Sequence, residues 1–157
     1  MSTPPKAYPL ALRWLTLRSR SEADLRQRLQ QKGCDHEEIE HALQRCCELG
    51  YIDDQRYAIE RAGQLMRRGR AVGIRLKQEL KKEGINEQQA QQAIEHCCHD
   101  LDEGQILADL VQRRYASTDF THLDQREQRR IVNYLQRRGF PLRLILDHLK
   151  KKKDTSC

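Results

Sequence analysis

The sequence predicts an all-α protein made of three tandem three-helix repeats that stack into an elongated, curved array. Apolar residues recur at spacings of three and four along the 157 residues, which is the period of one face of an α-helix. Runs of Leu, Arg, Gln and Glu with few β-branched residues favour helix over strand. A shift of 51 residues places residues 21–47 over residues 72–98, so that Cys46-Cys47 falls on Cys97-Cys98. A shift of 55 aligns a third, weaker copy.

The first unit is predicted over residues 7–52, after a disordered arm over residues 1–6. Its first helix has an apolar face of Ala7, Leu10, Ala11, Trp14 and Leu15. Ser21 is the expected N-cap of the second helix, and Gly33 is expected to end it in the left-handed conformation. The third helix runs from Asp35 to Gly50, and its apolar stripe is Ile39, Ala42, Leu43, Cys46 and Cys47.

The second unit is predicted over residues 53–101, with Asp53 or Asp54 capping its first helix. The second helix ends at Gly84, and its apolar residues are Ile74, Leu76 and Leu80. Asn86 and Gln89 then form a capping box for the third helix.

The third unit is predicted over residues 102–150, before a basic, disordered tail over residues 151–157. Asp124 and Glu127 start its second helix, and Gly139 ends it. The last helix carries Leu142, Ile145, Leu146 and Leu149.

The motifs of several functional classes are missing from the sequence. No apolar run approaches the roughly 18 residues of a membrane span, and the first nine residues lack the apolar segment of a secretory signal. The glycine-rich phosphate loops and the nucleophile elbow of hydrolases are also missing. The run His96-Cys97-Cys98-His99 does not predict a metal site, because consecutive helical residues point about 100° apart. We therefore expect a cytoplasmic, monomeric binding protein with reduced cysteines and no cofactor, metal or catalytic residue.

Charge is sorted by helix. The net charge is +6, and residues 56–82 hold nine Lys or Arg against two Asp or Glu. Residues 83–102, the third helix of the same unit, hold five acids and no Lys or Arg. Residues 13–32 and 126–153 are also mainly basic, and residues 35–48, the third helix of the first unit, are mainly acidic. Stacking is therefore expected to align the basic helices into one positive stripe suited to a polyanion. Local i, i+4 ion pairing is the alternative explanation of these charges.

Three segments, residues 18–29, 49–58 and 75–85, resemble the bacterial RecX regulatory proteins. The block Gly50-Tyr51-Ile52-Asp53-Asp54 carries the most specific part of this resemblance, which covers about residues 7–150. It implies three tandem three-helix repeats that bind the RecA filament and also associate with DNA. It further implies inhibition of RecA's ATPase, strand-exchange and coprotease activities in DNA repair and the SOS response.

The candidate binding residues are the basic side chains of the first two helices of each unit. They are Arg18, Arg20, Arg26, Arg28, Arg56, Arg61, Arg67, Arg68, Arg70, Arg75, Lys77, Lys81, Lys82, Arg129, Arg130, Arg137 and Arg138. Tyr51, Asp53 and Asp54 are expected to fix how one unit meets the next. The expected partners are the RecA filament and, weakly and with salt sensitivity, single- and double-stranded DNA. A helix-turn-helix transcriptional or nucleoid regulator, a helical scaffold for acidic proteins and an unrecognised enzyme are the competing interpretations.

Overall fold

The computed structural model describes residues 5–155, and within them the chain forms nine helices and no strand. The first three helices are α1 (Ala7–Leu17), α2 (Glu22–Gln31) and α3 (His36–Glu48). The next three are α4 (Asp54–Arg67), α5 (Gly73–Lys82) and α6 (Glu87–Asp100), and the last three are α7 (Glu103–Arg114), α8 (Gln125–Arg137) and α9 (Leu142–Thr155). The predicted all-α repeat array is thus confirmed. Residues 1–4 of the predicted arm lie outside the described residues.

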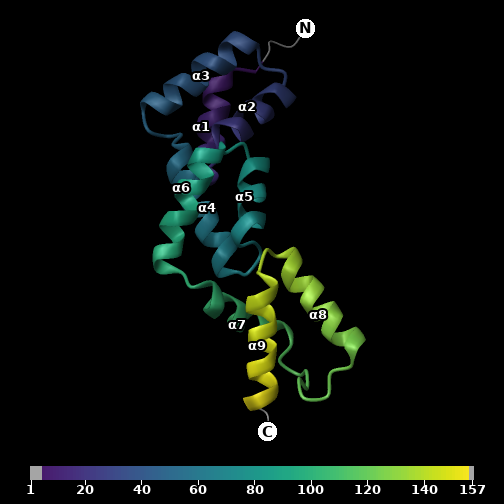
Figure 1. The fold of residues 1–157 in the computed structure, drawn as a ribbon. Helices are drawn as coiled ribbons and strands as arrows, with labels where there is room; N and C mark the ends of the chain where they lie inside the picture. Colours follow the sequence, from purple (N-terminus) through teal and green to yellow (C-terminus); the bar gives the residue numbers. More distant parts are fainter. Residues whose placement is uncertain (1–4, 156–157) are drawn as a thin grey trace.

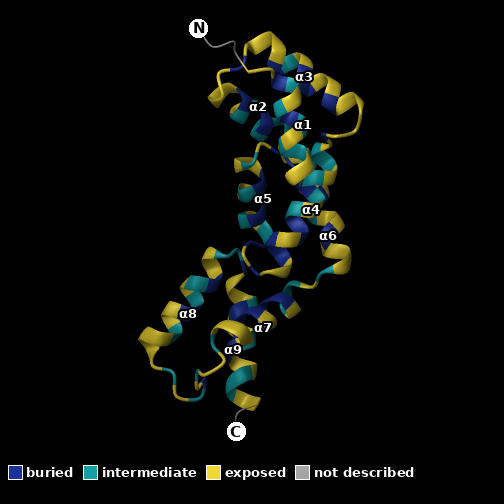
Figure 2. Cartoon of the chain, turned by 180° about the vertical axis from the view of Figure 1, so that it is seen from behind, coloured by how far each residue is buried: buried dark blue, intermediate teal, exposed yellow. Residues whose placement is uncertain are grey.

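The nine helices follow one another along a single long axis, from the N-terminal unit at one end to α9 at the other (Figure 1). The second helix of each unit lies on the same side of the molecule, so that α2, α5 and α8 succeed one another along it (Figures 1 and 2). The acidic third helices α3 and α6 lie on the opposite side in both views. The long shape exposes far more of each unit than a compact packing would.

The helix boundaries follow from capping residues visible in the sequence. The Ser21 hydroxyl accepts the N–H of Asp24 at the start of α2. Reciprocal capping boxes open α6 and α8, through Asn86 with Gln89 and through Asp124 with Glu127. Five helices end just before a glycine of positive φ, namely Gly33, Gly50, Gly69, Gly84 and Gly139.

The core is divided into two clusters, and the three units do not share it equally. The first unit has its own core, which includes the fully buried Leu25, Leu29 and Cys46. The second and third units share one continuous core that runs from Ala58 to Leu149. Burial therefore joins the second and third units firmly, whereas the first unit is attached through a smaller contact.

Several expected core residues are exposed. Cys47 and Cys98 face solvent while Cys46 and Cys97 are buried, because adjacent residues on a helix point about 100° apart. Ile74 is 73% exposed, and Leu142 and Leu146 are also exposed. The apolar helix faces predicted from the sequence were therefore too wide, because they included these exposed residues.

The C-terminal segment also differs from the prediction of a disordered tail. Residues 151–155 continue α9 without a break, and residues 156–157 lie outside the described residues. Lysine is a good helix former and no Gly or Pro interrupts the run, so the last helix continues through the basic segment.

Within the described residues, no helix is long and apolar enough to cross a membrane.

Candidate functional site: the grooves at the unit junctions

The second helices of neighbouring units meet end to end in the same way at both junctions. At the first junction the Ser21 hydroxyl donates to the carbonyl of Glu83 over 2.6 Å. At the second junction the backbone N–H of Val72 donates to the carbonyl of Arg138 over 2.9 Å. The shifts of 51 and 55 residues make Val72 the counterpart of Ser21, and Arg138 the counterpart of Glu83. One joint is therefore built twice, each time from the start of one second helix and the end of the next.

A glycine lets the two helix ends approach closely at each joint. Gly84 has φ +87° and Gly139 has φ +100°, both in the left-handed region. A Cβ on Gly84 would stand 2.2 Å from the Cβ of Ala23, and one on Gly139 would stand 2.1 Å from the carbonyl oxygen of Val72. No other residue type fits at either position without movement of the joint.

A groove lies beside each joint, and the two grooves share equivalent positions around the joint, although only the first is also lined by α4. The first junction groove is lined by residues 18–20, 23, 24, 27, 57, 60, 61, 64 and 82–84. The second junction groove is lined by residues 70, 74, 75, 78, 134 and 136–139. The shift of 51 residues aligns four lining positions of the first groove (19, 23, 24 and 27) with four of the second (70, 74, 75 and 78). The shift of 55 residues aligns residues 82–84 with residues 137–139. The shared geometry makes their different chemistry directly comparable.

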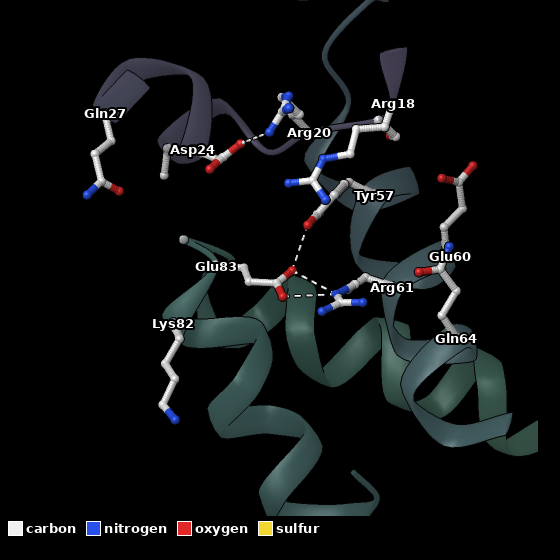
Figure 3. A pocket seen from close by; sticks show the side chains of 13 residues that line it. Arg18, Arg20, Asp24, Gln27, Tyr57, Glu60, Arg61, Gln64, Lys82 and Glu83 are labelled. Atoms are coloured by element: carbon white, nitrogen blue, oxygen red, sulfur yellow. Dashed lines mark hydrogen bonds and ion pairs between the residues drawn. The ribbon is translucent and has the colours of Figure 1, made fainter. Parts of the chain in front are cut away.

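The charges on the α4–α5 side of the first junction groove are satisfied internally. The Tyr57 hydroxyl donates to a carboxylate oxygen of Glu83 over 2.6 Å, and Arg61 Nε donates to the same carboxylate over 2.9 Å (Figure 3). Burial, together with the hydrogen bond to Glu83, raises the pKa of the Tyr57 phenol. Glu83 thus neutralises Arg61 and ties α4 to the end of α5.

A second carboxylate neutralises the α2 side of the same groove. Arg20, only 9% exposed, donates to Asp24 over 2.8 Å (Figure 3). Arg28 pairs with the same carboxylate over 3.0 Å. Burial alone would raise the pKa of Asp24, but the hydrogen bonds from the two guanidinium groups outweigh it and hold that pKa below its ordinary value. The first junction groove therefore has little charge left over for a ligand.

The three predicted junction residues have different surroundings. The Asp54 carboxylate accepts the backbone N–H of Glu22 over 2.9 Å, so it caps a helix of the preceding unit. Burial raises the pKa of this carboxyl group, and the nearby acids Glu22 and Asp53 add to that effect. Asp53 caps its own helix, α4, and Tyr51 is 50% exposed.

The second junction groove has the opposite chemistry. Arg75 stands where the first groove has Asp24, and Arg138 stands where it has Glu83. Arg70 and Arg137 complete a set of four arginines, and the lining contains no acidic residue. Arg75 pairs with Glu79 over 2.7 Å. Among the described residues, the other three arginines make no ion pair.

Aromatic residues orient the arginines around this groove, and sequence reasoning missed them. The guanidinium carbon of Arg138 lies 4.9 Å from the ring centroid of Tyr134, and that of Arg114 lies 4.2 Å from the same centroid. Tyr115 meets Tyr134 edge to face, with centroids 6.2 Å apart. Neither Tyr134 nor Arg114 was among the candidates. The signal that identifies the groove was present in the repeat alignment, as the replacement of two acids by arginine.

The remaining predicted basic residues are not part of the lining of either groove. Arg26 binds Glu40 over 2.9 Å, and Lys77 binds Glu87 over 2.9 Å, so both face the acidic third helices. Arg56 donates to the carbonyl of Gly50. The other exposed predicted residues that line neither groove are Arg67, Arg68, Lys81, Arg129 and Arg130. Arg130 lines a neighbouring pocket that shares Tyr134 and Arg137 with the second junction groove. Eight of the seventeen predicted basic residues thus line the two grooves, four in each.

Comparison with known proteins identifies the family. Residues 7–46 match the family model described as RecX, first three-helix domain. A protein named Regulatory protein RecX from Syntrophotalea carbinolica is 43% identical over 147 residues, which cover 94% of this chain and 96% of that protein. The chain belongs to the RecX family. A second relative of the same name, from Trichlorobacter lovleyi, is 38% identical over 94% of the chain.

Solved structures support the same fold for this RecX-family chain. The crystal structure of RecX from Lactobacillus salivarius superimposes with a TM-score of 0.67 at 22% identity and covers 96% of both chains. Another structure, described as regulatory protein RecX, gives a TM-score of 0.70 over 93% of this chain and 70% of that one.

Within residues 5–155, no group of three or more His, Cys, Asp or Glu side chains is arranged to hold a metal ion.

Proposed function

We propose that this RecX-family chain inhibits the RecA recombinase by lying along the RecA nucleoprotein filament and contacting both the protein and its DNA. Membership of a family of regulatory proteins is the observation that carries this proposal. The elongated stack of units supports it, because a long body can touch several successive protomers of a helical polymer (Figure 1).

Repetition supplies the affinity in this proposal. Each unit presents its second helix on the same side of the molecule, so contacts made by one unit hold the next unit close to its own site. Weak contacts then add through effective concentration. A chain that bridges neighbouring protomers obstructs their movement and addition, and inhibition of this kind needs no catalytic residue.

The charge distribution supports contact with a polyanion on the same side. Both junction grooves lie at the ends of second helices, whereas the acidic α3 and α6 lie on the opposite side of the molecule. Binding that neutralises phosphates releases counterions, so the DNA contribution is expected to weaken steeply with salt.

Co-sedimentation tests the proposal directly. The chain is mixed with RecA filaments assembled on single-stranded DNA, with free RecA, and with bare DNA, and the amount pelleted or retained is compared. Preferential binding to the assembled filament is the expected result. Equal binding to bare duplex DNA with no preference for the filament would contradict the proposal and favour a helix-turn-helix DNA regulator.

A further inference from the structure

The two junction grooves lie beside equivalent joints and differ in charge, and this difference assigns them different roles. Four basic residues line the first groove, but Asp24, Glu60 and Glu83 line it as well. The second groove has four arginines and no acid. Because equivalent helix ends meet at both joints, the surplus of positive charge is a property of the second groove itself.

We propose that the second junction groove binds the phosphates of single-stranded nucleic acid, and that the first junction groove is a closed structural joint. The inference deepens the proposed function, because it locates the DNA contact that the proposal requires. It depends on direct binding of DNA to this chain, which is measured in the absence of RecA.

Arginine is the side chain best suited to the phosphate part of this site. Its planar guanidinium donates two parallel hydrogen bonds to a phosphate, and it stays charged at every relevant pH. The groove has a volume of about 530 Å³ and is lined by Arg70, Arg75, Arg137 and Arg138. Arg75 pairs with Glu79, but the other three arginines make no ion pair among the described residues, and three cations lining one groove suit the closely spaced charges of a phosphodiester chain.

The apolar lining favours a single strand over a duplex. Ile74, which is 73% exposed, lines the groove at the position where the first groove has Ala23. Tyr134 adds an aromatic ring to the same lining. A single strand offers unstacked bases to such side chains, whereas the bases of a duplex are stacked and paired away from them.

Tyr134 also prepares the groove for an anion. Its ring lies within cation–π distance of both Arg138 and Arg114, which holds two long side chains without neutralising their charge. The counterpart of Arg138 in the first groove, Glu83, is instead bound by Tyr57 and Arg61. The second groove therefore keeps Arg138 oriented without an ion pair, whereas the first groove uses the equivalent position to join helices.

A pair of matched double variants tests the assignment. Arg70→Gln with Arg137→Gln removes two exposed charges from the second groove. Arg18→Gln with Lys82→Gln removes two charges from the first groove, and Lys82 is the repeat counterpart of Arg137. Both variants lose the same net charge. Fluorescence anisotropy of a labelled oligothymidylate is measured over a range of salt concentrations with the full chain, after circular dichroism has shown equal helicity and melting temperature.

The second-groove variant is expected to bind oligothymidylate at least about tenfold more weakly than the parent. The slope of the logarithm of its association constant against the logarithm of the salt concentration is expected to become shallower by roughly 1.4, because each of the two lost phosphate contacts contributes about 0.7 on a single strand. The first-groove variant is expected to stay within about twofold of the parent. Equal weakening by both variants would overturn the proposal, because only net charge would then matter. An equal loss on duplex DNA would overturn the assignment to a single strand.

The RecA assay separates this inference from the proposed function. Loss of filament inhibition by the second-groove variant with unchanged binding of oligothymidylate would overturn the inference and assign the groove to an acidic protein surface. If the unmodified chain binds oligothymidylate through this groove but leaves RecA fully active, the inference stands and the proposed function fails.

Discussion

The joint between the second and third units rests on Gly139, and alanine at this position tests it. The residue has φ +100°, and a Cβ there would stand 2.1 Å from the carbonyl oxygen of Val72 and 2.9 Å from the Cβ of Arg75. The oxygen belongs to the backbone, so it cannot rotate away as a flexible side chain would. The joint must open, and the hydrogen bond from the Val72 N–H to the Arg138 carbonyl is strained with it.

The expected loss of stability has two parts. The left-handed conformation costs an alanine roughly 1–2 kcal/mol, and forced overpacking adds about 1–3 kcal/mol. Gly33 separates these parts, because it has φ +79° and nothing within 4 Å of its ideal Cβ. Gly33→Ala is therefore expected to show the conformational cost alone, and Gly139→Ala both costs.

Urea unfolding followed by circular dichroism measures the two free energies. The account predicts that Gly139→Ala lowers the free energy of unfolding by about 1–3 kcal/mol more than Gly33→Ala does. Equal losses in the two variants would refute the reasoning, because they would mean that the helix ends do not meet as closely as the structure has them.

Three further predictions concern charge and pH. Glu83→Gln weakens the bonds from Tyr57 and Arg61, so urea unfolding is expected to show a loss of about 1 kcal/mol. Burial raises the pKa of Asp54, so its ionised carboxylate lowers the stability of the fold near neutral pH. Asp54→Asn keeps an oxygen that accepts the N–H of Glu22, and it is expected to unfold at a higher urea concentration than the parent at neutral pH. This difference in stability is expected to shrink at acidic pH, where Asp54 of the parent becomes protonated. Burial and two neighbouring lysines lower the pKa of His148 in the folded chain. As the pH drops below 6.5, the unfolded chain takes up the proton more readily than the folded chain, so the stability of the fold decreases. His148→Leu is expected to reduce this loss, which is measured as the melting temperature over a range of pH.

The sequence was sufficient for the elements of the fold, because their signals are local. Capping residues such as Ser21 and Asn86, and the glycines after the helices, act within a few residues of the chain. The repeat period of 51 residues added the tandem arrangement. None of these signals depends on how the units meet.

The details that the sequence did not predict depend on contacts between units. Periodicity placed Ile74 inward, yet this residue faces the second junction groove because α8 ends beside α5. The charge counts treated all basic residues alike, although Arg20 and Arg61 are neutralised by Asp24 and Glu83 while Arg137 is not. Tyr134 escaped notice because a single tyrosine on a basic helix carries no signal until its neighbours are known.

The rate of ATP hydrolysis by RecA on single-stranded DNA tests the central claim most directly. The chain is titrated from well below one molecule per RecA protomer up to equimolar amounts. A regulator that lies along the filament is expected to suppress hydrolysis at substoichiometric ratios, because each bound chain affects several protomers. An unchanged rate at equimolar protein would contradict the account.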